Sequence, residues 1–208
     1  MVQSLVTDVF SRSLYGLYLL QPRDFHTVHK IEFGHIPVNV FVYYLDQGLG
    51  IGSKSPLFNR HQLTLTKFIN LNNQEKGVGK PLPAVLVLHG HYAGCVGDLP
   101  SYDAFTLGGP YSVRGYGMGE LGASRNVLEV AGEVRIPVKN TYVYGFAEHG
   151  TDLGSSKDVK GNPTEFFRRV GHGSSYGVGV KLGLVRGEYI VDHNTGAGTV
   201  FFRFGERF

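Results

Sequence analysis

The chain of 208 residues lacks tryptophan and contains a single cysteine, Cys95. One cysteine excludes an intrachain disulfide framework and any zinc site built from several cysteines. Long apolar runs are also missing. The longest candidate, residues 14–20, falls well short of the roughly 18 apolar residues that a membrane-spanning helix needs. If this chain crosses a membrane, it therefore does so with strands alone.

Strong charge is absent as well, because the formal net charge is only +3. A charge this small does not indicate nucleic-acid binding, so no nucleic-acid partner is expected. The N-terminus has no basic region followed by an apolar stretch and a small-residue cleavage site, so no secretory signal is predicted.

Glycine and aromatic residues are plentiful: the chain has 30 glycines, 12 tyrosines and 14 phenylalanines. Glycine at this level without a Gly-X-Y period excludes collagen. Together with many aromatic residues it favours tightly curved sheets and the aromatic girdles of membrane barrels.

Apolar and polar residues alternate along most of the chain after residue 37, which predicts an antiparallel all-β domain over residues 38–208. Residues 1–37 are poorly assignable, and residues 2–20 fit a short amphipathic helix as well as a strand. Long polar or glycine-rich loops are expected at residues 46–60, 70–83, 93–121 and 151–173. Strands are expected at residues 25–33, 38–45, 61–69, 84–92, 127–136, 141–150, 176–182, 184–192 and 199–208.

Each strand of the second half has one apolar face and one face of charged residues or glycine. Eight or nine strands of about nine or ten residues, patterned in this way, are typical of a transmembrane β-barrel. A soluble β-sandwich is the alternative, although its strands are usually about five or six residues long. On the barrel interpretation seven charged residues line the interior: Glu129, Glu133, Arg135, Lys181, Arg186, Glu188 and Arg203.

The glycine-rich stretch at residues 107–116 carries one central cation, Arg114, and has no hydrophobic period. It lies in the long loop predicted at residues 93–121, and a loop of that length is more often functional than idle. Arg114 is either a solvated loop cation or a group that reaches for a partner.

The motif Val113-Arg114-Gly115-Tyr116, within Gly-Gly-Pro-Tyr-Ser-Val-Arg-Gly-Tyr, resembles the signature loop of the bacterial surface antigen superfamily. This superfamily comprises outer-membrane assembly and two-partner-secretion barrels of bacteria and their organelle relatives. Residues 46–54, 58–63 and 202–208 are similar to the chloroplast outer-envelope translocon channels among them. From about residue 46 onward the chain resembles the C-terminal half of such a channel.

The resemblance implies a complete barrel of roughly sixteen strands, preceded by soluble domains, in the plastid outer membrane. It implies transport of unfolded precursor proteins rather than catalysis, with no cofactor and no metal. The partners it implies are membrane lipid, the precursors and other translocon subunits. Since only half of the barrel is encoded, the alternative is a truncated, non-conducting paralogue. Such a paralogue would act in outer-membrane protein insertion or as a structural partner, by self-association or alongside a full-length barrel.

In this superfamily the loop arginine folds into the barrel and meets acidic residues of the wall. The matching wall motif, Phe-x-Asp-x-Gly, corresponds here to Phe146, Glu148 and Gly150, with glutamate in place of aspartate. A lumen-facing glutamate on the preceding strand corresponds to Glu133. A guanidinium offers a rigid fork of donors that two carboxylates can share, and lysine cannot copy it.

The terminal Phe208 is either simply the chain end or a recognition signal for barrel insertion. Enzyme motifs are weak by comparison. Residues 173–177 fit a nucleophile elbow around Ser175, and residues 117–122 fit a dinucleotide fingerprint, but a strand pattern follows each where a helix is needed. His89 and His91 share a strand face and are either metal ligands or plain lumen or surface histidines. Cys95 is expected to be a loop thiol.

Overall fold

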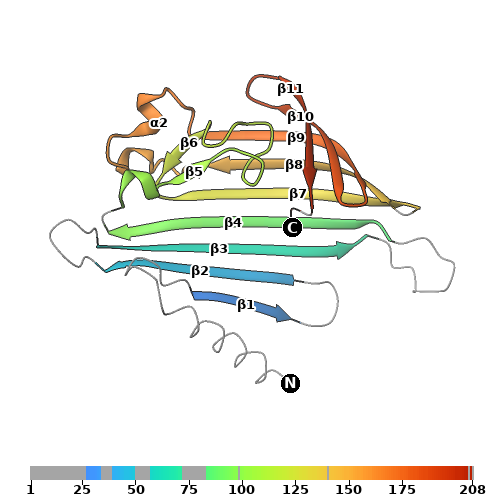
Figure 1. Cartoon of the computed structure of the whole chain (residues 1–208), viewed down its shortest axis with the longest axis horizontal. Coiled ribbons are helices and arrows are strands. Elements are labelled where there is room, and N and C mark those ends of the chain that lie inside the picture. The colour runs from blue at the N-terminus through green and yellow to red at the C-terminus, as the bar shows by residue number, and fades with distance from the viewer. Residues whose placement is uncertain are drawn as a thin grey trace.

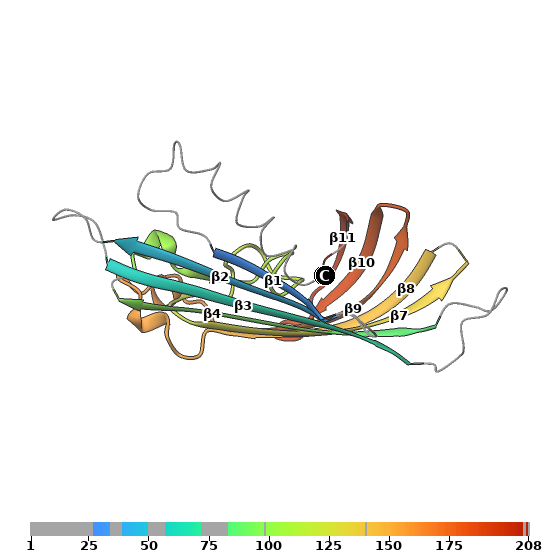
Figure 2. The same ribbon diagram turned by 90° about the horizontal axis from the view of Figure 1, so that it is seen from below.

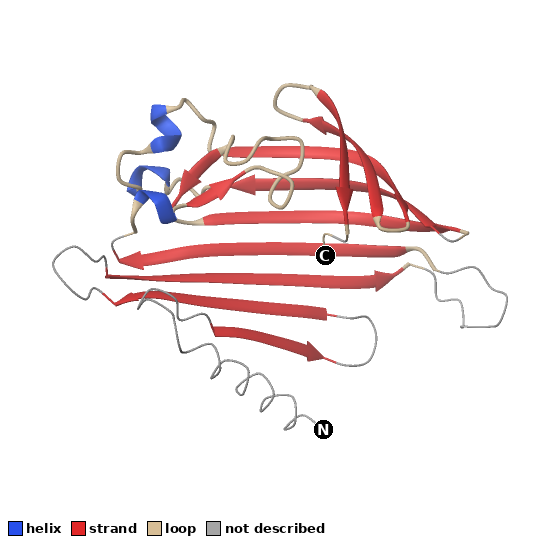
Figure 3. Cartoon of the chain, in the orientation of Figure 1, coloured by secondary structure: helices blue, strands red, loops and turns tan. Residues whose placement is uncertain are grey.

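The computed structural model describes residues 27–33, 39–49, 57–71, 83–97, 99–139, 141–205 and 207. Most of them form one antiparallel sheet of nine strands, and neighbours in the sheet follow one another along the chain (Figure 1, Figure 3). The strands are β1 (Thr27–Phe33), β2 (Asn39–Leu49), β3 (Leu57–Asn70), β4 (Val85–Gly97), β7 (Val127–Val138), β8 (Thr141–Thr151), β9 (His172–Leu182), β10 (Val185–Asp192) and β11 (Gly198–Phe204). The prediction of an antiparallel all-β fold with eight or nine strands is confirmed.

A second, two-stranded sheet pairs β5 (Phe105–Leu107) with β6 (Gly122–Ser124). Among the described residues, three one-turn helices accompany it: η1 (Ser101–Asp103), η2 (Ser156–Asp158) and α2 (Pro163–Phe166). Figure 2 shows that the main sheet is strongly curved and that the chain between β5 and β6 lies on its concave side. Among the described residues, no helix is both long and apolar enough to cross a membrane.

Several strands are longer than predicted. β4 continues to Gly97, because residues 93–97 keep pairing with β3 from Gln62 to Phe58. β2 runs on to Leu49 and β3 begins at Leu57, so the loop expected at residues 46–60 is mostly strand. Small residues such as Gly94 blur the alternation in this region, but the hydrogen-bonded ladder extends through them.

The final strand is shorter than predicted, since β11 ends at Phe204 and not at the chain end. Gly205 follows with φ +85°, a left-handed conformation that glycine adopts at no steric cost and that turns the backbone out of the strand. Phe208 and the N-terminal segment of residues 1–26 lie outside the described residues.

The two faces of the sheet are inverted relative to a soluble protein. Large apolar side chains on the convex face are exposed, as at Val178 (61%) and Phe202 (72%). Charged side chains on the concave face are buried, and Glu133 and Arg186 are fully inaccessible. An apolar exterior around a polar interior is the pattern of a membrane barrel. It argues against the soluble sandwich, which would bury its apolar face.

Two glycines on the concave face of β9 make room for aromatic rings of β8. A Cβ at Gly177 would lie 2.8 Å from the Phe146 ring, and one at Gly179 would lie 2.4 Å from the Tyr144 ring. Glycine inside a strand often marks such a close approach. The sequence Gly177-Val-Gly179 therefore allows Tyr144 and Phe146 to lie across their neighbouring strand.

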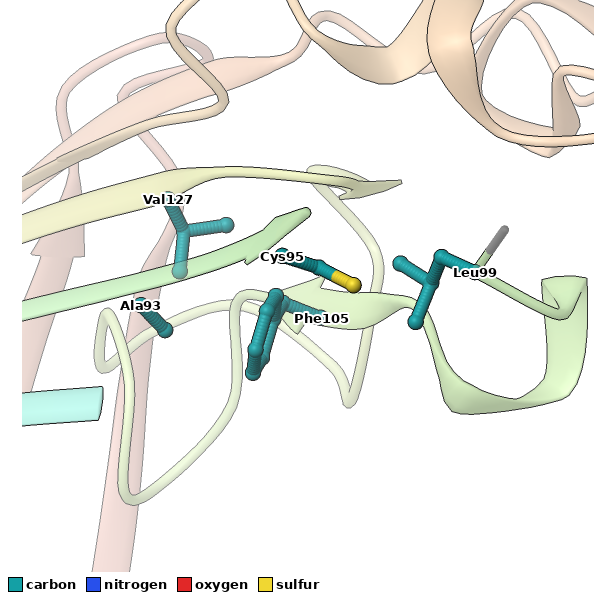
Figure 4. Packing of buried hydrophobic residues seen from close by; sticks show 5 residues of the cluster. All are labelled: Ala93, Cys95, Leu99, Phe105 and Val127. Carbon is teal, nitrogen blue, oxygen red and sulfur yellow. The ribbon is translucent and has the colours of Figure 1, made fainter. Parts of the chain in front are cut away.

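A small apolar cluster joins the end of the main sheet to β5 (Figure 4). It consists of Ala93, Cys95, Leu99, Phe105 and Val127. Cys95 is a buried residue of β4, so the expectation of a loop thiol is wrong. The extra length of β4 is the reason, because it carries Cys95 into the sheet. The cluster anchors the start of the loop that carries Arg114.

Candidate functional site

The loop between β5 and β6 is compact because its own backbone closes it. Gly108 and Gly109 have φ values of +95° and +127°, which favour glycine. The Gly109 amide donates to the Val113 carbonyl at 3.1 Å, and the Ser112 amide donates to the Gly109 carbonyl at 3.1 Å. This tight turn presents Arg114 to the concave face of the sheet.

Arg114 is buried against three glutamates from three strands, and its side chain is 1% exposed. Its Nε donates to Oε1 of Glu148 at 2.7 Å, and its backbone amide donates to the other oxygen of that carboxylate at 2.9 Å. Its Nη1 donates to Glu188 at 2.8 Å, while Nη2 lies 3.7 Å from a carboxylate oxygen of Glu133. The guanidinium therefore joins the loop to β7, β8 and β10 at once.

An aromatic ring closes the remaining side of this site. The guanidinium carbon of Arg114 lies 3.4 Å from the centre of the Phe146 ring. A cation over an aromatic face is worth about 2 kcal/mol or more when it is desolvated. Phe146 can lie there because Gly177 on β9 leaves room for its ring.

The three glutamates are shared with further arginines and a tyrosine of the wall. Glu133 accepts hydrogen bonds from Arg186 at 2.8 Å and from Arg135 at 2.7 Å. Glu188 accepts from the Tyr144 hydroxyl at 2.8 Å and from Arg203 at 2.9 Å. Glu148 accepts from Arg207 as well. Buried carboxylates are tolerated only with such partners, so the network depends on each of its charges.

Apolar contacts fit the loop to the wall beside the charged network. Val113 of the loop and Leu107 at the end of β5 are fully buried. They pack over Gly150, where a Cβ would lie 2.6 Å from Val113 Cγ2 and 2.8 Å from Leu107 Cδ1. Gly150, the glycine of the Phe-x-Glu-x-Gly motif, thus leaves the space that these two apolar side chains fill.

Two more polar contacts hold the loop on either side of Arg114. The Tyr116 hydroxyl contacts the carboxylate of Asp192 and lies 2.9 Å from the Ser174 carbonyl. The Ser112 hydroxyl donates to Glu129, whose other carboxylate oxygen lies 3.2 Å from Nδ1 of His91. The loop is therefore bound at three successive points.

The phenol of Tyr116 supplies a test of this docking. Burial, helped by the hydrogen bond to Asp192, raises the pKa of Tyr116 above its ordinary range. Because the protonated form is favoured, its contribution to docking is fully present below about pH 10 and is lost only as pH rises through the raised value. We expect Tyr116→Phe to remove one tyrosine from the late-titrating part of the tyrosinate absorbance. Tyr111→Phe, at an exposed tyrosine, is the control, and loss of the late phase in that variant would contradict the assignment.

The structure brings some predicted residues together and separates others. Arg186, Glu188 and Arg203 join Glu133 and Glu148 around Arg114. Glu129 and Lys181 have other contacts. Glu129 bonds Ser112, and Lys181 Nζ lies 5.3 Å from the Tyr142 ring centre.

Sequence reasoning missed four roles in this site. Glu188 was predicted only as a wall residue, but it binds Arg114 directly. Ser112, Asp192 and Arg207 were not singled out. Strand parity was a signal for both charged residues among these: Asp192 shares a face with Glu188 on β10, and Arg207 has the parity of Arg203 in the strand predicted at residues 199–208.

The structure also places the weak enzyme motif at residues 173–177 and the histidine pair of β4. Residues 173–177 lie inside β9, so Ser175 is not on a strand-to-helix turn and the nucleophile elbow is wrong. His89 bonds Thr66 while His91 contacts Glu129. In the part of the chain that the structure describes, no three His, Cys, Asp or Glu side chains are grouped to hold a metal.

Comparison with known proteins places this geometry in a family. Residues 39–192 match the Omp85 superfamily domain. The chain is 91% identical over 167 residues to "Protein TOC75, chloroplastic" of Oryza sativa subsp. japonica, covering 80% of this chain and 20% of that protein. It is 70% identical over 179 residues to "Protein TOC75-4, chloroplastic" of Arabidopsis thaliana, covering 86% of this chain and 45% of that protein.

A more distant relative carries the chloroplast outer envelope in its name. "Outer envelope protein 80, chloroplastic" of Arabidopsis thaliana is 33% identical over 198 residues, covering 90% of this chain and 25% of that protein. The chain thus spans about a fifth of the length of the rice relative and less than half of the Arabidopsis TOC75-4 protein.

Proposed function

Because this chain belongs to the Omp85 superfamily, we propose that it forms the C-terminal wall of a protein-conducting channel. The loop between β5 and β6, residues 108–121, is then the lumen loop of that channel. It is a plastid outer-membrane protein, as its TOC75 and outer envelope relatives are. Its barrel domain spans residues 38–208, and its cargo is unfolded precursor protein. The work is transport and involves no bond chemistry.

The observation that carries this proposal is the burial of Arg114 among Glu133, Glu148 and Glu188. A loop cation bound by three strands turns the loop inward, so the loop occupies the interior and not the outer surface. The exposed apolar residues of the convex face are left for membrane lipid.

The lumen wall suits a polypeptide that must pass without being trapped. Glu133 forms direct ion pairs with both Arg135 and Arg186. Passage requires binding that is favourable enough to enter yet weak enough to leave. A wall whose charges are already paired offers polar contacts without a strong site for one segment.

Planar-bilayer recording of the purified chain tests the proposal. We expect single-channel conductance that is blocked by an Arg- and Ser-rich, acid-poor peptide, the composition of organelle targeting segments. A peptide of the same length rich in acidic residues is the control and is expected not to block.

A second candidate function is favoured by the open sheet. In the described part of the chain β1 and β11 each pair on one side only, and open strand edges do not persist in lipid. The chain then acts beside other barrel strands, as a non-conducting partner in membrane-protein insertion or in a translocon. Silence over many reconstitutions, with the chain retained in carbonate-washed membranes, would support this candidate against the first.

A further inference from the structure

Two arginines at the C-terminal end of the chain hold the loop by its backbone. Arg203 on β11 donates from Nη1 to the Pro110 carbonyl at 3.1 Å. Arg207, just beyond β11, donates from Nη2 to the Ser112 carbonyl. Both carbonyls belong to the turn that presents Arg114, so the two arginines grip this turn on either side of Tyr111.

Each of these arginines also holds one of the carboxylates that bind Arg114. The Nη2 of Arg203 donates to Oε1 of Glu188 at 2.9 Å, and the Nη1 of Arg207 donates to Oε1 of Glu148. Nη1 of Arg114 donates to the same Glu188 oxygen, and Nε of Arg114 to the same Glu148 oxygen. Both C-terminal arginines therefore bridge a wall carboxylate to a loop carbonyl.

This bridging requires the guanidinium fork. Two donors at a fixed spacing can serve a carboxylate and a carbonyl together, whereas one ammonium group is a single point charge. The Arg203 and Arg207 side chains are 6% and 5% exposed, so water does not replace their bonds readily. A cation that only balanced wall charge would have no need to reach the loop backbone.

The position of β11 gives these contacts a mechanical consequence. Within the described sheet, β11 pairs with β10 alone and is its C-terminal edge. Edge strands open more easily than interior strands because one side of the ladder is missing. Any displacement of β11 carries Arg203 and Arg207 away from Pro110 and Ser112.

We propose that Arg203 and Arg207 are positioning residues that form a clasp between the C-terminal strand and the lumen loop. While β11 lies against β10, the clasp keeps the loop seated, and movement of this edge strand releases it. This inference rests on the proposed function, because it assigns a control to the same loop.

A cysteine placed at the buried Val113 reports on loop seating. The test uses the full chain in lipid vesicles with Cys95→Ala and Val113→Cys, and measures labelling by a membrane-impermeant maleimide. We expect Arg203→Gln and Arg207→Gln each to speed labelling about tenfold, as loss of charge-assisted bonds would. Arg207→Lys is expected to fall between them and the parent, since lysine keeps the charge but not the fork.

Arg168→Gln is the matched control, because Arg168 is exposed on the loop after α2. It is expected to leave the labelling rate unchanged. Circular dichroism and heat-modifiable gel mobility establish that each variant is folded. Where Arg207→Gln does not fold, Arg207→Lys and Arg203→Gln carry the test.

Three outcomes are distinguishable. Faster labelling in the Arg203 and Arg207 variants, with partial rescue by lysine, supports the clasp. Unchanged labelling in both, with faster labelling in Arg114→Ala, overturns the clasp and leaves the seated loop intact. Unchanged labelling in all three overturns the clasp together with the lumen loop of the proposed function.

Discussion

Replacing Arg114 with alanine is expected to unseat the lumen loop. The change removes the cation that Glu148, Glu188 and Glu133 share and the contact with the Phe146 ring. Removing one partner of a buried ion pair costs about 3–5 kcal/mol, because the remaining charge stays desolvated. A loss of that size moves the loop from almost wholly seated to largely released.

Limited proteolysis of the loop between β5 and β6, residues 108–121, in folded protein measures this effect. Cleavage is expected to be rapid in Arg114→Ala and slow in the parent. Arg114→Lys is expected to recover only part of the protection, because an ammonium cannot serve two carboxylates in the geometry of the fork. Arg125→Ala is the control, since Arg125 donates to the backbone carbonyls of Cys95 and Gly97 at the end of β4. Equal cleavage in Arg114→Ala and the parent would show that Arg114 does not seat the loop.

Gly150→Ala is expected to displace the same loop by steric means. The new methyl group would lie 2.6 Å from Val113 and 2.8 Å from Leu107, closer than carbon atoms approach in proteins. Both Val113 and Leu107 are fully buried, so the clash has no free space to relieve it. Adding a methyl group to a filled core costs about 1–3 kcal/mol, and the branched side chain of Gly150→Val should cost more.

The strand itself offers a matched control for this substitution. Gly145 lies on β8 with its face toward the exterior, and the nearest atom to a Cβ there is a carbonyl oxygen at 3.9 Å. Gly145→Ala is therefore expected to leave protease protection of the loop unchanged. Val113→Ala, combined with Gly150→Ala, is expected to restore part of the protection because it removes the opposing methyl groups. Failure of this pair to compensate would show that Gly150 acts through something other than the loop contact.

Local patterns were enough to predict which side chains face the interior. Glu133, Arg186 and Glu188 alternate with apolar neighbours, and an alternation of period two places them on one face whatever the curvature of the sheet. Strand ends were less predictable. β4 continues through Gly94 to Gly97 because β3 offers it a partner, and a ladder partner is not visible in the sequence of β4 itself.

The sequence by itself determined that the fold is antiparallel β, that charge faces inward, and that one loop carries a lone arginine. These features depend on near neighbours along the chain. Only the tertiary structure decided that Glu188 binds Arg114 and that Arg203 and Arg207 grip Pro110 and Ser112. Such contacts join residues more than 70 positions apart. They depend on register, sheet curvature and the turn at Gly205, and no local alternation contains that information.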